Sequence, residues 1–274
     1  MSRNRLNQNP STRRYSRKKK SPLFRVASFG IVALVIYYFT SSLFSRVERD
    51  NLTLCRLDRA FSRDTALLID ETGGYSQAQA DLISTSIENI LTNSLVDDKF
   101  TFYSLGESVS SYLPSFSICN PGDESDQGDL TTDQRRLFAD WKEDSHDRVV
   151  SSLDELVDRE AAEFSPIMEM IRYVSNQTRF SSPDIQKRMI IVSDLIQNTP
   201  SYSQHNDSKD FDTIRGTNYL TGVQAFLSGV DVQILYVQRP QLLAIQNRDH
   251  IESFWRPYVN LSEGRIVSVD RINL

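Results

Sequence analysis

Residues 64–274 alternate between short apolar runs and segments whose apolar side chains recur every three or four residues. The short runs, bounded by turn residues, predict buried strands, and the helical spacing predicts amphipathic helices packed against a sheet. A helix between two successive strands predicts a βαβ unit with a right-handed crossover. The order predicts an α/β fold, a doubly wound and mostly parallel Rossmann-like sheet with helices on both faces. The predicted strands are 64–69, 99–105, 188–192, 230–237 and 264–269, and the predicted helices are 77–95, 132–163, 165–174, 219–227 and 241–258.

Two of the predicted strands end on an aspartate. The first runs into Asp70, which is followed by hydroxyls at Thr72 and Ser76 and by two glycines between them. The apolar run at 189–192 ends in a serine and Asp194. In an open α/β sheet the carboxyl ends of the strands meet at one edge, and ligand sites form there. The sequence therefore predicts a polar site built from these strand ends.

Two polar segments and one helix start complete this pattern. Residues 198–216 would lie above the carboxyl edge of the sheet, either as a functional lid or as a disordered excursion. Residues 117–133 are acidic but lack the ligand spacing of an EF-hand, so a solvated turn is predicted. Ser165 before Pro166 predicts a helix start, because serine is a good N-cap and proline suits the first helical position.

The N-terminal region has the pattern of a signal anchor. Residues 26–44 carry no charge over nineteen positions, which is enough to cross about 30 Å of hydrocarbon as a helix. Nine Lys or Arg residues precede this run, whereas the charges just after it nearly cancel. The positive-inside rule then predicts a single-pass inner-membrane protein with a cytoplasmic N-terminus and a periplasmic, or otherwise extracytoplasmic, C-terminal domain. A cleaved signal peptide and a buried core helix are the alternatives.

The charge distribution divides the chain into four parts. We expect a basic, disordered tail at 1–22, a transmembrane helix at 23–45, a linker at 46–63 and the α/β domain at 64–274. Nine of the 31 basic residues precede residue 46, so the other 22 stand against all 36 acidic residues in the remainder. An acidic domain of this kind argues against nucleic acid as a partner, because phosphate binding needs a basic surface.

Cys55 and Cys119 are the chain's two cysteines. An exported domain permits a disulfide, and two cysteines are the number that allows one. The alternative is a pair of buried free thiols.

The strand ends resemble the von Willebrand factor A (VWA) domain. Its metal-ion-dependent adhesion site uses an Asp-x-Ser-x-Ser loop, a Thr on a second loop and an Asp on a third. The resemblance covers roughly residues 64–270, and implies that Asp70 anchors the first loop and Thr72 takes its first hydroxyl position. It further implies that Ser165 replaces the Thr and that Asp194 is the third-loop acid. The chain looks most like bacterial membrane-anchored A-type proteins, through Cys119-Asn120-Pro121-Gly122 and a terminal helix with Phe254, Trp255 and Tyr258.

Two positions depart from the VWA pattern and make the adhesion site degenerate. The second hydroxyl position falls on Gly74, and Leu195 stands where a glycine usually follows the aspartate. The resemblance implies Mg²⁺, which takes oxygen ligands in octahedral geometry and keeps several waters. An open coordination position would accept an acidic side chain of a partner protein. The alternative, without an ion, is that Asp70 caps the next helix and Asp194 begins a turn. The implied ligands are Asp70, Thr72, Ser76, Ser165 and Asp194.

Signatures of catalysis are missing from the sequence. It contains neither a Gly-x-Ser-x-Gly elbow nor a P-loop, and its three histidines are scattered on polar segments. We therefore expect a protein that is not an enzyme and that mediates protein–protein interaction on the non-cytoplasmic side of the membrane. One alternative is a metal-free scaffold of an envelope complex that uses the helix at 132–163 as its contact surface. The other is a hydrolase with Asp70 as nucleophile or base.

Overall fold

The computed structural model describes residues 30–37, 47–106, 113–123, 134–157, 160–177, 185–207 and 209–273. Two compact units are present, Met1–Val47 and Glu48–Leu274. In the first unit, residues 30–37 are helical. The rest of the predicted membrane span, residues 23–29 and 38–45, lies outside the described residues. Within the ranges that are described, no helix combines the length and the apolar character that a membrane crossing requires.

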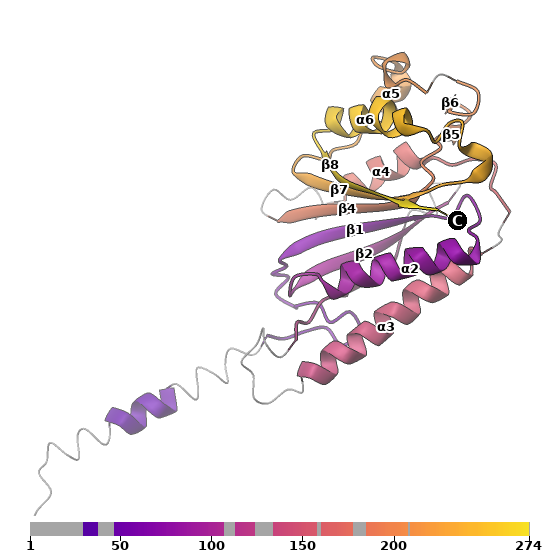
Figure 1. Ribbon diagram of the computed structural model, residues 1–274. Coiled ribbons are helices and arrows are strands. Elements are labelled where there is room, and N and C mark those ends of the chain that lie inside the picture. Colours follow the sequence, from indigo (N-terminus) through magenta and orange to yellow (C-terminus); the bar gives the residue numbers. More distant parts are fainter. Residues whose placement is uncertain are drawn as a thin grey trace, which may run out of the picture. The chain divides into compact units, whose positions relative to one another are not determined.

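The second unit is built on a six-stranded sheet in the order β3-β2-β1-β4-β7-β8 (Figure 1). All neighbouring strands are parallel except β3, which pairs antiparallel with β2 at one edge. The predicted α/β class with a mostly parallel sheet is confirmed. β3 was not predicted, and its last three residues, 117–119, had been assigned to the loop at 117–133. The strands are β1 (Arg63–Asp70), β2 (Asp98–Leu105), β3 (Pro114–Cys119), β4 (Gln186–Ser193), β7 (Val230–Val237) and β8 (Arg265–Ile272).

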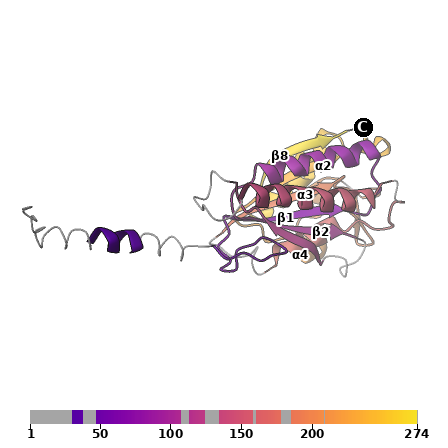
Figure 2. The ribbon, with the colours of Figure 1, turned by 90° about the horizontal axis from the view of Figure 1, so that it is seen from below.

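Helices cover both faces of the sheet, as Figures 1 and 2 show. One face packs against α2 and α3, and its core includes Ile83 and Ile87 of α2 and Trp141 of α3. The other face packs against α4, α5 and α6 around a core that includes Met168 and Tyr258. Because both faces are covered, β1 is a continuous buried run instead of an alternating one. The helices are α2 (Gln77–Thr92), α3 (Gln134–Asp154), α4 (Ile167–Ser175), α5 (Asn218–Val223) and α6 (Arg256–Leu261).

The segment at 198–216 is packed into the domain. It forms a short hairpin, β5 (Asn198–Thr199) with β6 (Tyr202–Ser203), and a 3₁₀ turn at Phe211–Thr213. Tyr202 and Phe211 are buried, and both contact Phe254: the Tyr202 ring stacks on it and the Phe211 ring meets it edge to face. These contacts tie the segment to the core. The segment is mostly polar, and the burial of its few apolar side chains holds it against the domain.

The predicted helix at 241–258 is broken into pieces. A 3₁₀ turn at Pro240–Leu242 is followed by a π-helical stretch at His250–Trp255 and then by α6. The wider π turn buries His250 and Trp255 together with Phe254. The aromatic side chains therefore face the core in a register that a regular α-helix does not provide.

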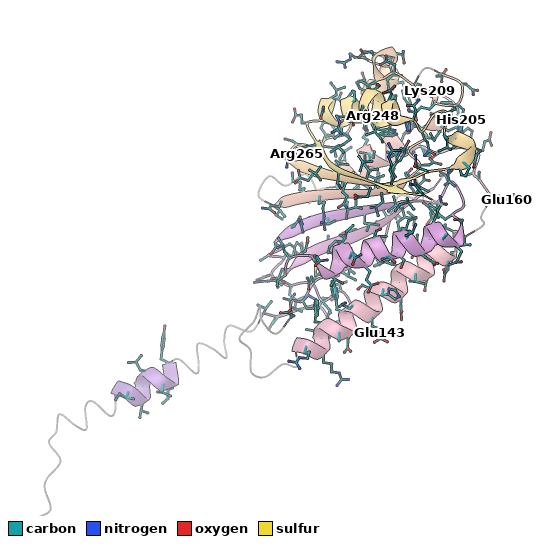
Figure 3. All side chains as sticks on the ribbon, in the orientation of Figure 1. Glu143, Glu160, His205, Lys209, Arg248 and Arg265 are labelled. Atoms are coloured by element: carbon teal, nitrogen blue, oxygen red, sulfur yellow. A yellow bond between two sulfur atoms is a disulfide. The ribbon has the colours of Figure 1, made fainter. Side chains whose placement is uncertain are left out.

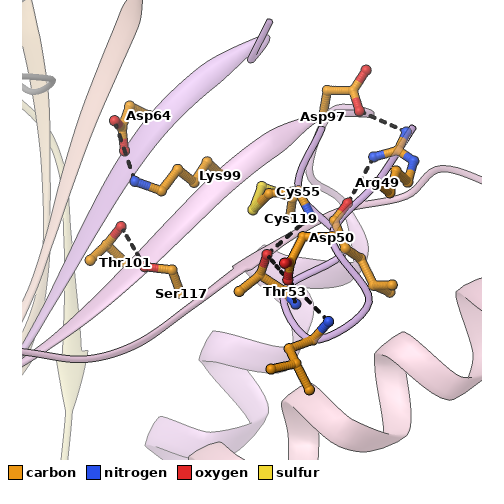
Figure 4. The surroundings of a disulfide bond; sticks show 12 residues. Arg49, Asp50, Thr53, Cys55, Asp64, Asp97, Lys99, Thr101, Ser117 and Cys119 are labelled. Carbon is orange, nitrogen blue, oxygen red and sulfur yellow. Dashed lines mark hydrogen bonds and ion pairs between the residues drawn. A yellow bond between two sulfur atoms is a disulfide. The ribbon is translucent and has the colours of Figure 1, made fainter. Parts of the chain in front are cut away.

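The amino ends of the strands are tied to residues 48–62, which belong to the second unit rather than standing apart as a linker. The predicted disulfide between Cys55 and Cys119 is present and joins this segment to β3 (Figure 4). Nearby, Asp97 is paired with Arg49 at 2.7 Å and with Arg56 at 3.2 Å. The disulfide closes a loop of 64 residues, and such a loop is expected to add about 4 kcal/mol of stability by restricting the unfolded chain.

Candidate functional site

Three adjacent strands, β1, β4 and β7, end at the same place. Ile69 of β1 is opposite Val192 of β4, and Ser193 of β4 is opposite Tyr236 of β7. The chain segments that follow these strands therefore meet at the carboxyl edge. The sequence predicts a site at the first two of these ends. The third end carries Arg239, two residues beyond β7, which no sequence pattern marked as a site residue.

Asp70 lies at the centre of this edge and is 1% exposed. Its Oδ2 accepts a hydrogen bond from Ser193 Oγ at 2.6 Å. Its Oδ1 accepts one from the Thr72 amide at 2.9 Å and one from Thr72 Oγ1 at 2.5 Å. Tyr75 donates its hydroxyl to the Asp70 carbonyl oxygen. Both carboxylate oxygens are therefore satisfied by the protein itself.

Burial raises the pKa of Asp70 to about 6. Repulsion from the nearby Asp194 carboxylate adds to this rise, whereas the hydrogen bonds from Ser193 and Thr72 oppose it. Desolvation contributes most to the raised pKa of Asp70. A carboxylate that no cation contacts directly is costly to ionise in the protein interior.

Ser165 joins the site through its side chain and not as a helix cap. Thr72 Oγ1 and Ser165 Oγ lie 2.8 Å apart. The backbone of Ser165 is fixed by paired hydrogen bonds with Asn198, at 2.7 and 3.0 Å. The N-cap of α4 is Pro166, with no side-chain cap, so the predicted capping role of Ser165 is wrong. Its hydroxyl is turned toward Thr72 instead.

Ser76 is placed away from this group. It is the N-cap of α2, where its Oγ accepts a hydrogen bond from the Gln79 amide and its own amide donates to Gln79 Oε1, both at 3.2 Å. This is a complete capping box. The structure thus brings together Asp70, Thr72, Ser165 and Asp194 and leaves Ser76 at the helix start.

Arg239 holds the other acid of the site. Its Nε donates to Asp194 Oδ2 at 2.5 Å, and both side chains are 12% exposed. Its Nη1 donates to the Gly74 carbonyl oxygen at 2.5 Å. The guanidinium also lies over the Tyr75 ring, 5.7 Å from its centre. The ion pair joins the loop after β7 to the loops after β1 and β4.

Two further contacts fix the loops that carry this pair. Gln246 Nε2 donates to the carbonyl oxygens of Asp194 and Val237, at 3.0 and 2.8 Å. Gln246 Oε1 accepts from the Arg239 amide at 2.7 Å. Leu195 adopts a φ of 58°, in the left-handed region that favours glycine. Its side chain is fully buried.

A cavity of about 410 Å³ opens beside these residues. Thr72, Gly73, Ser165, Asp194 and Arg239 are among the residues that line it. His205, which is exposed, also lines the cavity, and Figure 3 labels it. The arrangement can offer hydroxyls, a guanidinium and a histidine to a group that enters from outside.

The donor set does not fit the Mg²⁺ that the resemblance implies. Thr72 and Ser165 hydroxyls 2.8 Å apart would suit two neighbouring ligands of an octahedral ion. Asp194 Oδ2, however, is bonded to Arg239, and Gly74 supplies only a carbonyl oxygen, which accepts from the same guanidinium. In the part of the chain that the structure describes, no group of three or more His, Cys, Asp or Glu side chains is placed to hold a metal. Mg²⁺ binding therefore stays a prediction, and one that Arg239 opposes.

Comparisons with known proteins give structural neighbours and no sequence relative. No family model and no curated protein matches the chain. A protein described as BatB from Bacteroides thetaiotaomicron matches 77% of this chain and 90% of its own, with 11% identity and a TM-score of 0.40. A von Willebrand factor type A protein from Catenulispora acidiphila matches 78% of this chain at 12% identity and a TM-score of 0.36. Proximal thread matrix protein 1 from the mussel byssus matches 68% of this chain at 15% identity and a TM-score of 0.37.

The lengths covered differ among these neighbours. The chain spans 41% of the mussel protein and 39% of the Catenulispora protein. The neighbours include A-type proteins, the class that the sequence resembles. At these scores they say nothing about site residues or function, and the α/β architecture rests on the strand order described above.

Proposed function

We propose that this chain is a membrane-anchored VWA-like protein that binds another protein at the carboxyl edge of its sheet. The observation that carries the proposal is the cavity where Asp194, Arg239, Thr72 and Ser165 converge from separate loops. Buried, hydrogen-bonded polar groups beside an opening are typical of binding sites positioned by a rigid scaffold. The partner would insert a polar side chain there.

Binding is favoured over hydrolysis by the state of Asp70. A carboxylate nucleophile or base needs an oxygen within reach of the reacting atom. Both oxygens of Asp70 accept hydrogen bonds from Ser193 and Thr72, and the side chain is almost fully buried. Asp70 supports the loop that carries Thr72, and the proposal assigns no catalytic residue.

The anchor and its orientation remain part of the proposal on sequence grounds. The uncharged run at 26–44 and the nine basic residues before it support a single span with the N-terminus in the cytoplasm. The Cys55–Cys119 disulfide is consistent with a domain on the oxidising side, because such bonds persist outside the cytosol.

The binding surface can be tested by photo-crosslinking in the native host. A benzoylphenylalanine at Leu242, beside the cavity, is expected to give a discrete crosslinked product that disappears when Asp194→Asn is added. Matched probes at exposed Glu143 of α3 and Arg265 of β8 serve as controls (Figure 3). A product from position 143 alone would favour the scaffold alternative, and no product from position 242 would contradict the proposed surface.

The anchor is tested separately by extraction and thiol labelling. The full chain should stay with membranes at high pH, and its cysteines should react with maleimide only after reduction. Removal of residues 26–44 should release the protein. Release of the intact chain by alkali, or free thiols in unreduced cells, would contradict the membrane assignment or the exported side, respectively.

A further inference from the structure

We propose that Arg239 is the built-in cation of this site, standing in the place of a divalent metal and making partner binding independent of metal. The inference rests on the proposed function for its last step only. Its first step, the exclusion of divalent ions by Arg239, concerns the isolated chain. The ligand class follows from the guanidinium, whose remaining N–H groups would donate to an acceptor oxygen of the partner.

The contacts of the guanidinium leave one side unused. Nε is bonded to Asp194 and Nη1 to the Gly74 carbonyl. No acceptor among the described residues is hydrogen-bonded to Nη2. Nη2 is also absent from the fully buried polar atoms that have no partner, so it is accessible from outside. Since Arg239 lines the cavity, this nitrogen remains available to a group that enters there.

The lack of a side chain at Gly73 leaves room for the Arg239 guanidinium. A Cβ on Gly73 would lie 2.4 Å from Nη2 and 2.9 Å from Cζ, so a side chain at this position would collide with the guanidinium. Gln246 holds the Arg239 backbone on one side, and the Tyr75 ring lies under the guanidinium on the other. A position with this many constraints holds the cation in one orientation, as a ligand site requires.

The charges explain why Arg239 and a divalent ion exclude each other. Asp194 is the acid that the VWA pattern assigns to the metal, and its Oδ2 is the atom bonded to Arg239. A divalent ion beside Thr72 and Ser165 would have to compete for Asp194 and would also repel the fixed guanidinium. Removing the positive charge should therefore open the site to metal.

The test uses the full chain in detergent, with Mn²⁺ as the probe and electron paramagnetic resonance to count free ion. We expect no saturable Mn²⁺ binding to the wild-type chain. Arg239→Gln should bind one Mn²⁺ saturably, at least about tenfold more tightly than the weakest binding that the titration detects, and Arg239→Gln with Asp194→Asn should lose this binding. Arg256→Gln is the control for the loss of a positive charge, because Arg256 pairs with Glu252 at 2.7 Å on the protein surface and neither residue lines the cavity.

Two results would overturn the inference. One is saturable Mn²⁺ binding to the wild-type chain that Asp194→Asn abolishes. The other is an Arg239→Gln variant that folds, with its disulfide intact, and binds no more tightly than wild type. If Arg239→Gln fails to fold, Gly73→Ala replaces it, because the added Cβ displaces the guanidinium; Mn²⁺ binding to this variant at the wild-type level would likewise overturn the inference.

The last step is tested on the crosslinked product from position 242. We expect this product to survive EDTA and to disappear in Arg239→Gln. Loss in EDTA would overturn metal independence. If position 242 gives no product at all, the proposed function fails, whereas the Mn²⁺ result still decides the role of Arg239.

Discussion

Buried aspartates at the two ends of the parallel strands have different hydrogen-bond partners. At the amino end, Asp98 is fully buried and accepts hydrogen bonds from Arg63 Nε and Nη2, while Asp97 is shared by Arg49 and Arg56. At the carboxyl end, Asp70 is equally buried but is bonded only by hydroxyl and amide groups. The guanidinium there is bonded to Asp194.

The difference separates a structural joint from a candidate site. Guanidinium groups and the disulfide fix the amino end, where β1, β2 and the segment 48–62 are joined. At the carboxyl end the hydrogen-bond donors come from separate loops, and a cavity lies between these loops. We therefore expect changes at the amino end to affect stability and changes at the carboxyl end to affect binding.

The largest effect should come from removing the disulfide at the amino end. Cys55→Ser with Cys119→Ser should lower the unfolding free energy by about 4 kcal/mol, because the unfolded chain regains the freedom of a long loop. Urea unfolding measures the loss. The Mn²⁺ gain of Arg239→Gln should persist in this background under folding conditions, and its disappearance would show that the two ends are not independent.

The same substitution should have opposite effects at the two ends. Asp98→Asn should destabilise the domain by about 3 kcal/mol, because it leaves Arg63 without its buried carboxylate partner. Asp70→Asn should stabilise it by up to about 3 kcal/mol at pH 8, because it removes a charge whose pKa is raised by burial. Urea unfolding of both variants at pH 8 tests the comparison, and losses of similar size would refute it.

The stability of the domain should depend on pH through two buried groups. Burial raises the pKa of Asp70 to about 6, so between its usual 3.8 and 6 the folded chain holds a proton that the unfolded chain has released. Its contribution to stability is therefore lost as the pH rises through this range. Burial lowers the pKa of His250 from 6.5 to about 4. Its contribution is fully present above pH 6.5 and is lost as the pH falls, because the unfolded chain takes up the proton.

Difference curves between each variant and wild type should separate the two groups. Relative to wild type, Asp70→Asn should lose about 3 kcal/mol of stability as the pH falls from 6 to 4, and His250→Gln should gain about 3 kcal/mol between 6.5 and 4. Urea unfolding at stepped pH gives both curves. A flat difference curve would show that the pKa of the corresponding group does not differ between the folded and unfolded chain.

The smallest effect should follow from a methyl group at the site. Gly73→Ala should cost about 1 to 2 kcal/mol, because its Cβ meets the Arg239 guanidinium and forces that side chain to move. Gly222→Ala is the matched control, since no heavy atom outside its chain neighbours and its own helix backbone lies within 4 Å of its Cβ position, and helix α5 favours alanine. Equal stability changes for the two variants would argue against a tightly fitted guanidinium.

The local pattern was enough to place most of the sheet and part of the site. The apolar run at 230–237 coincides with β7, and the run that ends on Asp70 is β1. Asp70 and Thr72 lie at the carboxyl edge, as the strand pattern predicts. Ser165 meets Thr72 there, and it was the resemblance, not the strand pattern, that assigned Ser165 to the site. β3 escaped notice because its pairing with β2 is a long-range contact, and its side chains alternate only weakly.

Residue type and spacing along the chain were enough to place five of the six strands of the sheet, the aspartates at two of their ends and the cysteine pair. Only the tertiary structure decided that β7 lies next to β4, which brings Arg239 to Asp194 across 45 residues of chain. It also decided that Ser76 caps a helix while Ser165 turns to Thr72. Hydrogen-bond partners of this kind are chosen by which loops meet in space, and no local spacing records that choice.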